Sequence, residues 1–170
     1  MSLQYRLYSK PQPTTTVIAK NAFAANTIKT ILQFKPLLPC KIYNWGCSFD
    51  NNSANVPGTI ELLDTGTVAA TVTAFANADI VKLNAAAREF GDPTSALISV
   101  GTSASGYDAT AEGTITATQL YDALQQPPTQ PYVMPWPLGR EGEVKASNII
   151  RIRGNFASAV NVLAFIDVEF

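Results

Sequence analysis

The chain has 170 residues, of which 46% are hydrophobic and 15% charged, with a formal net charge of −1 and no histidine. This length is expected to give one domain with a core of its own. The lack of histidine excludes Ser-His-Asp and Cys-His catalysis and imidazole metal ligands, and the scattered lysines and arginines argue against a nucleic-acid partner.

Residues 1–26 are predicted to form an extended arm outside the domain. Pro11 and Pro13 forbid a helix, and the threonines that follow favour an extended backbone. A frayed terminus is the alternative for such a composition. The arm residues expected to make attachment contacts are Tyr5, Leu7, Tyr8, Pro11 and Pro13.

Strands are predicted at short intervals after the arm, over residues 27–35, 41–50 and 59–64. Clusters of Pro, Asn and Gly close each of them, including a polar turn that contains residues 51–55. Trp45 lies inside an apolar strand and is expected in the core.

Cys40 and Cys47 flank the run KIYNWG. If this run is a strand, its ends lie about 23 Å apart, whereas a disulfide needs Cα atoms within about 7 Å. We therefore expect two buried free thiols.

The middle of the chain carries mixed signals. Residues 68–93 contain an alanine-rich stretch that predicts one short helical turn or loop, ended by Gly91-Asp92-Pro93. Further strands are predicted over 95–101 and 114–124. Five prolines within residues 125–144 predict an irregular surface crossing.

Trp136 stands between Pro135 and Pro137 in that surface segment. Its ring could stack on a sugar, anchor a protein interface or form a lid over the end of the domain. The sequence leaves these three alternatives open.

The last residues predict a terminal hairpin made of residues 149–153 and 160–170. In the second strand, alternation places Val162, Ala164 and Ile166 on a core face. Leu163 and Phe165 then lie on the opposite face, where a half-solvated strand does not need apolar side chains. Some other surface is expected to cover them.

Paired carboxylates are the remaining catalytic possibility, as in glycosidases. The candidate pairs are Glu61 with Asp64, Asp108 with Glu112, and Glu141 with Glu143. Each acid also stands where a solvated strand end or turn would place one, so no catalytic residue, metal site or cofactor is expected.

These elements amount to seven or eight strands with little helix and several long connections. The pattern favours an all-β fold, a β-sandwich of jelly-roll or Greek-key type, over a meander. The expected organisation is an N-terminal arm at residues 1–26 and a β-sandwich domain at residues 27–170.

The order of six segments resembles a group of small proteins encoded among the structural genes of tailed bacteriophages. These segments are TILQFKP, YNWGCSFD, TIELLD, GYDATAEGTITA, PYVMPWPLGREGEV and RIRGNFASAVNVLAFIDVEF, and the likeness covers residues 27–170. It implies a β-sandwich virion component, such as a capsid decoration or head-fibre protein, with no enzymatic role.

Under this resemblance we expect a homo-oligomer, a trimer, with Leu163, Phe165 and Trp136 at the interface. It would be made in the host cytoplasm and attached through its arm to the major capsid protein or another virion protein, with no membrane partner. One alternative is a carbohydrate-binding module of a phage tail or fibre, and a weaker one is a glycan-cleaving enzyme.

Overall fold

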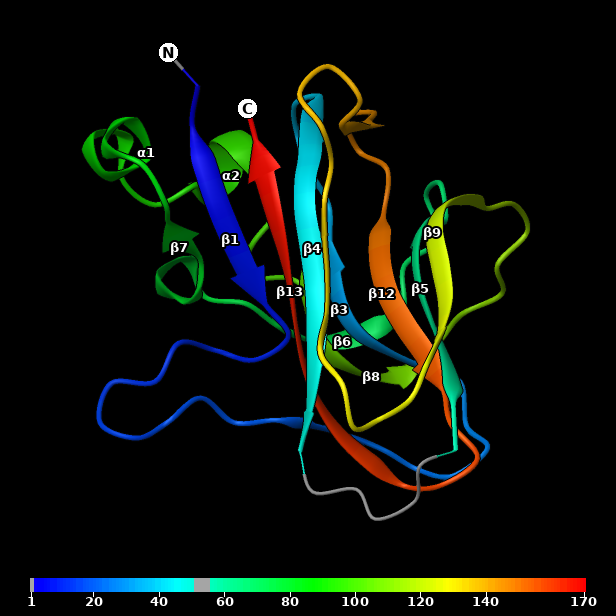
Figure 1. The fold of residues 1–170 in the computed structure, drawn as a ribbon. Coiled ribbons are helices and arrows are strands. Elements are labelled where there is room, and N and C mark those ends of the chain that lie inside the picture. Colours follow the sequence, from blue (N-terminus) through cyan, green and yellow to red (C-terminus); the bar gives the residue numbers. More distant parts are fainter. Residues whose placement is uncertain (1, 51–55) are drawn as a thin grey trace.

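The computed structural model describes residues 2–50 and 56–170, so the polar turn predicted at 51–55 lies outside the described residues. Two antiparallel sheets pack against each other (Figure 1), and helix is limited to a few short turns. The predicted all-β class is confirmed, while a jelly-roll or Greek-key connectivity remains a prediction.

The first sheet has seven strands, and β13 is at its centre. Its main order is β10-β4-β13-β1-β7, with β11 added beside β4 and β2 beside β13. The strands are β1 (Gln4–Tyr8), β2 (Asn21–Phe23), β4 (Cys40–Asp50), β7 (Val81–Lys82), β10 (Tyr132–Pro135), β11 (Gly142–Val144) and β13 (Val160–Glu169).

The second sheet has six strands in the order β6-β8-β3-β12-β5-β9. Its strands are β3 (Lys29–Phe34), β5 (Gly58–Asp64), β6 (Thr71–Ala74), β8 (Gly106–Ala111), β9 (Gln119–Gln126) and β12 (Ile150–Asn155). The helical turns are η1 (Asn77–Asp79), α1 (Ala85–Phe90) and α2 (Thr94–Leu97). The short helix predicted before Gly91 is confirmed as α1, whose last turn ends at this glycine with φ of 94°.

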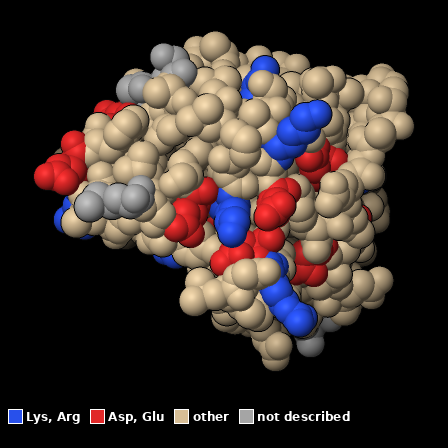
Figure 2. Space-filling view, turned by 90° about the horizontal axis from the view of Figure 1, so that it is seen from above, with Lys and Arg blue, Asp and Glu red and all other residues tan. Residues whose placement is uncertain are grey.

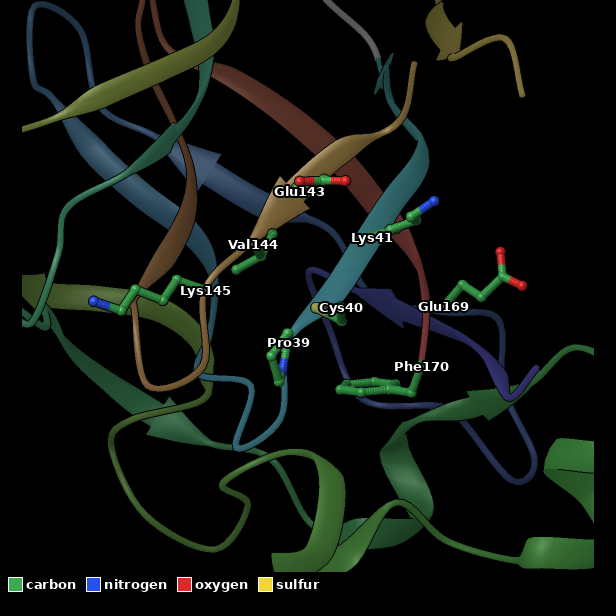
Figure 3. A pocket seen from close by; sticks show the side chains of 8 residues that line it. All are labelled: Pro39, Cys40, Lys41, Glu143, Val144, Lys145, Glu169 and Phe170. Atoms are coloured by element: carbon green, nitrogen blue, oxygen red, sulfur yellow. The ribbon is translucent and has the colours of Figure 1, made fainter. Parts of the chain in front are cut away.

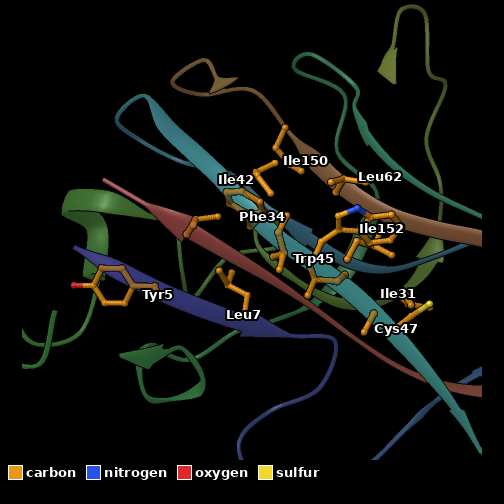
Figure 4. Close-up of a cluster of buried hydrophobic side chains, with 14 of the residues drawn as sticks. Tyr5, Leu7, Ile31, Phe34, Ile42, Trp45, Cys47, Leu62, Ile150 and Ile152 are labelled. Carbon is orange, nitrogen blue, oxygen red and sulfur yellow. The ribbon is translucent and has the colours of Figure 1, made fainter. Parts of the chain in front are cut away.

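The core lies between the two sheets and is built by period-two alternation along their strands. Figure 4 shows Tyr5 and Leu7 of β1 together with Ile42 and Trp45 of β4 among side chains from the second sheet. Trp45 is fully buried, as predicted, and Cys47 beside it is buried and free, as is Cys40.

One edge of the two sheets is joined by a carboxylate. Asp122 of β9 accepts a hydrogen bond from the indole Nε1–H of Trp45 at 3.1 Å and another from the Tyr132 hydroxyl at 2.7 Å. Because β9 belongs to the second sheet while Trp45 and Tyr132 belong to the first, these bonds fasten the sheets together at this side.

The N-terminal arm is shorter than predicted. Tyr5 and Leu7 are completely buried, because β1 pairs with β13 over residues 4–8 and with β7 on its other side. The domain therefore begins at β1, and the part of the attachment prediction that names Tyr5 and Leu7 is wrong. A strand whose partner is about 160 residues away gives no local signal of its pairing.

The predicted terminal hairpin is also wrong. Strand β12 pairs with β3 and β5, whereas β13 pairs with β4, β1 and β2, so the turn after Asn155 carries the chain from one sheet to the other. Alternation shows that a strand has two faces, but it does not show which sheet the strand joins.

Three other boundaries differ from those predicted. Residues 95–101 contain the end of α2 and one isolated bridge rather than a strand, and the strand predicted at 114–124 is β9, which begins at Gln119. Within 125–144, β10 and β11 form at the edge of the first sheet, where proline is tolerated because one side of the strand needs no hydrogen bond.

The position of β1 in the core predicts a large effect of Leu7→Ala. Truncating this fully buried side chain should lower the free energy of unfolding by about 2–5 kcal/mol. The matched control is Leu138→Ala, because Leu138 is 95% exposed and its truncation should cost less than about 0.5 kcal/mol. Urea denaturation followed by circular dichroism measures both, and equal small effects would place β1 outside the core.

Candidate functional site: the outer face of the seven-stranded sheet

An apolar row crosses the outer face of the first sheet. Val133 of β10, Gly46 of β4, Phe165 of β13 and Tyr8 of β1 stand opposite one another in register across four strands. Val133 is 54% exposed, and Phe165 and Tyr8 are half-buried. In Figure 1, β1 and the upper part of β13 are seen without another helix or strand in front of them.

Gly46 makes the row possible. A Cβ at this position would lie 2.9 Å from the Phe165 ring and 2.5 Å from the Tyr132 carbonyl oxygen, so any side chain would clash with backbone. The Phe165 ring therefore occupies the space over Gly46 that a side chain would fill.

An arginine covers the other side of that ring. The Arg6 guanidinium carbon lies 4.3 Å from the Phe165 ring centroid, a distance at which cation and π face attract. Arg6 also donates two hydrogen bonds to the Asp167 carboxylate, of 2.6 and 2.7 Å, and one of 3.3 Å to the Tyr8 hydroxyl. We call Arg6, Tyr8, Asn44, Phe165 and Asp167 the outer-face cluster.

Asp167 is the buried member of the cluster, with 2% of its side chain exposed against 26% for Arg6. Asn44 donates a further hydrogen bond of 2.9 Å to its carboxylate. The hydrogen bond to Asp167 raises the pKa of Arg6, although burial alone would lower it. Burial, with a smaller contribution from Asp167, raises the pKa of the nearby Tyr43 to about 12.

The predicted interface residues do not all meet here. Leu163 and Phe165 lie on this face as expected, with Leu163 half-buried beside Ser48. The Trp136 ring instead packs partly buried against the core, and its backbone N–H donates to the Tyr43 carbonyl at 2.9 Å. Of the three alternatives for Trp136, this contact favours the lid.

The remaining attachment residues lie in two places. Tyr8 joins the outer-face cluster, while Pro11 and Pro13 are in the long loop between β1 and β2. Sequence reasoning missed Arg6, Asn44 and Val133. The sequence does contain one cue to this cluster. Arg6 and Asp167 carry opposite charges, and each lies on the outward face of a strand with alternating side chains.

Among the acids of the candidate catalytic pairs, Glu61, Asp64 and Glu112 have structural partners. Glu61 accepts a hydrogen bond from Arg153 at 2.8 Å, and Glu112 binds the backbone N–H of Thr30 at 2.6 Å. Asp64 accepts from Gly66 and Asn148. Among the described residues, no group of three or more Cys, Asp or Glu side chains is arranged to hold a metal ion.

A cleft of about 720 Å³ opens at the end of the sandwich near the chain termini (Figure 3). It is lined by Pro39, Cys40, Lys41, Glu143, Val144, Lys145, Glu169 and Phe170. Figure 2 looks down on this end, where basic and acidic side chains are intermixed. Two lysines and two glutamates balance each other, so the cleft has no preference for one sign of ligand charge.

None of the helices in the described residues has the length and apolarity that a bilayer crossing requires.

The outer-face cluster predicts a specific double-mutant result. Arg6→Met should lower the free energy of unfolding by about 3 kcal/mol, because it leaves the buried Asp167 carboxylate without its cation. Arg6→Met with Asp167→Leu should recover most of this loss, since an apolar pair leaves no charge unpaired. Urea denaturation of the parent, both single variants and the double variant measures the coupling, and additive losses would contradict it.

The two buried thiols predict that the folded state loses stability at alkaline pH. Burial raises the pKa of Cys40 and of Cys47 to about 12, whereas unfolded thiols ionise near pH 8.5. The folded state thus keeps these protons longer, so stability is fully present below about pH 8.5 and is lost as pH rises toward 12. Each thiol should contribute a slope of up to about 1.4 kcal/mol per pH unit in that window.

Urea midpoints measured between about pH 6 and 11 test this slope. The variant Cys40→Ala with Cys47→Ala should start from a lower stability and fall less steeply between about pH 9 and 10. An identical slope in both proteins would show that the thiols do not cause the loss.

No family model, curated protein or solved structure matches the chain. The likeness to phage structural proteins therefore remains a resemblance in the order of segments. Function has to be inferred from the geometry of the described residues, chiefly from the outer face of the seven-stranded sheet.

Proposed function

We propose that this chain is a structural virion protein: a homotrimeric capsid decoration or head-fibre subunit attached to the outside of a tailed phage head. The outer face of the seven-stranded sheet forms its subunit interface. The major capsid protein or another virion protein is its attachment partner, and the start of the loop between β1 and β2, which contains Pro11 and Pro13, is its attachment element.

The observation that carries this proposal is the contrast between the two outer faces of the sandwich. On the six-stranded sheet, the chain itself covers outward side chains of the inner strands β3 and β12. Its fully buried Gln33 hydrogen-bonds to Ala70, Ser103 and Ala104, and its fully buried Arg151 donates to the carbonyl oxygens of Val68 and Glu112. On the seven-stranded sheet, the Arg6 side chain lies over the Phe165 ring, and Val133 of the apolar row is 54% exposed.

The composition of the uncovered face also supports an interface. Aromatic residues and arginine are enriched at the centres of protein interfaces, where they form contacts of high binding energy. Here Tyr8, Phe165 and Arg6 lie together and are already fixed by Asp167, so little side-chain freedom is lost on association. The low charge content of the chain fits a surface that is partly hidden in an assembly.

The carbohydrate-binding alternative rested on a free Trp136 ring. Because that ring packs against the core, it presents less of its face for stacking on a sugar. No contact among the described residues favours this alternative over a structural role.

The interface predicts that charge on the outer face of the seven-stranded sheet dissociates the oligomer. Val133→Asp with Leu163→Asp should convert a trimer into a folded monomer, since each association would bury unpaired carboxylates. Both side chains lie outside the core, so the circular dichroism spectrum should not change. Light scattering after size exclusion measures the mass.

Leu138→Asp is the matched control, because Leu138 is exposed but lies outside the row. A monomeric parent, or an oligomer that survives both acids, would contradict the interface. The virion assignment has its own test: an antibody against the chain should label phage heads in immunogold electron microscopy. Label confined to tail fibres would favour the carbohydrate alternative.

A further inference from the structure

The loop between β1 and β2 contains five consecutive β-branched residues, Thr-Thr-Thr-Val-Ile, at positions 14–18. Four of these side chains are exposed, and Val17 is 88% exposed. Within the described part of the chain, no backbone hydrogen bond involves any of the five residues. We call residues 14–18 the donor segment.

The amino-acid sequence of the donor segment favours a paired β-strand, but the segment lies in an unpaired loop. Branching at Cβ restricts the side-chain rotamers and favours the extended backbone of a paired strand. The chain bends at residues 14–16, and the five uncharged residues have no partner strand, so their backbone groups are satisfied only by solvent. Such mismatches between propensity and structure are expected where a protein makes a functional contact.

A polar cluster holds both ends of the loop, so that it projects from the body (Figure 1). The Asp108 carboxylate forms ion pairs with Lys10, at the start of the loop, and with Lys29 at 3.0 Å. It also accepts a hydrogen bond of 3.0 Å from the fully buried Asn21 at the other end. Burial alone would raise the pKa of Asp108, but these three partners outweigh it and lower that pKa.

A second segment with an unpaired backbone edge lies at the far side of the molecule. Strand β9 is the last strand of the six-stranded sheet, and in the described residues its outer edge pairs with no strand. Its eight residues contain no lysine and no proline, the residues that usually protect an edge. Its one charge, Asp122, points inward to Trp45 and Tyr132.

The donor segment and this edge match each other in chemistry. Neither carries a charge that faces outward, and Ala123 and Gln125 are exposed beside the open edge. In Figure 1 the loop leaves the body on the side of β1, whereas β9 borders the opposite side. The loop therefore does not reach the β9 edge of its own chain, although a second copy can bring that edge to it.

We propose that the donor segment of one copy adds as a β-strand to the free edge of β9 in a second copy. The donor and acceptor surfaces differ, so the contact is head-to-tail and closes into a ring when the rotation between copies allows it. The inference rests on the homo-oligomer of the proposed function and names the backbone contact that links its subunits.

Cross-linking between two singly substituted proteins tests the pairing directly. Copies with Val17→Cys and copies with Ala123→Cys carry different affinity tags, and a short bis-maleimide is added to each protein alone and to their mixture. Both positions are exposed, and burial keeps Cys40 and Cys47 unreactive. The expected product is a mixed dimer that appears only when both proteins are present. If the mixture forms mixed oligomers but no cross-linked dimer, the proposal is overturned. Cross-linked dimers of the Val17→Cys protein alone also overturn it.

Thr16→Pro provides an independent test. Proline removes the N–H of the central donor residue and disfavours sheet pairing, while the monomer loses no hydrogen bond. The association constant should fall at least tenfold in light scattering, whereas the control Thr16→Ser should match the parent. An oligomer that survives Thr16→Pro but is dissociated by Val133→Asp with Leu163→Asp overturns strand addition and leaves the proposed interface standing.

Thr16→Pro and the cross-link between positions 17 and 123 also show whether the donor segment pairs with a second copy of this chain or with a capsid protein. If the donor segment pairs with an edge of another virion protein, Thr16→Pro leaves the mass of the oligomer unchanged and the cross-link to position 123 does not form. That result also overturns the proposal. A monomeric parent overturns both the strand addition and the proposed function.

Discussion

The fold depends on the position of β13 at the centre of the seven-stranded sheet. This strand pairs with β4 along one side and with β1 and β2 along the other, so segments from both ends of the sequence meet on it. Without these pairings, Tyr5 and Leu7 would have no core to enter. Because the contact between β1 and β13 closes a loop of nearly the whole chain, its entropy cost is high and folding is expected to be slow.

The same strand also determines the outer surface. Successive side chains of β13 alternate between faces, so a strand that supplies Ala164 and Ile166 to the core necessarily presents Phe165 and Asp167 outward. Neighbouring strands then place Gly46 beneath the ring and Arg6 over it. The candidate interface is thus a product of register: a shift of one residue in β1 would exchange Arg6 for a core side chain and leave Asp167 without its cation.

Local patterns predicted what depends on local physics. The all-β class, the burial of Trp45, the free cysteines and the short helix before Gly91 follow from alternation, spacing and capping residues. Pairings between strands far apart in the sequence could not be predicted, because the alternation in β1, β12 and β13 is compatible with either sheet. Burial on an outer face was equally hidden: Arg151 alternates with isoleucines as a solvent-facing residue would, yet the chain folds a loop and Glu112 over it.

The bond between Trp45 and Asp122 gives the molecule an internal optical probe. The indole is fully buried, and its N–H is held by a carboxylate that belongs to β9, the strand with the open edge. Its fluorescence therefore depends on how closely the two sheets approach at that corner. A change in the position of β9 alters the polarity around the indole, so the emission of Trp45 reports events at the rim of the sandwich from inside its core.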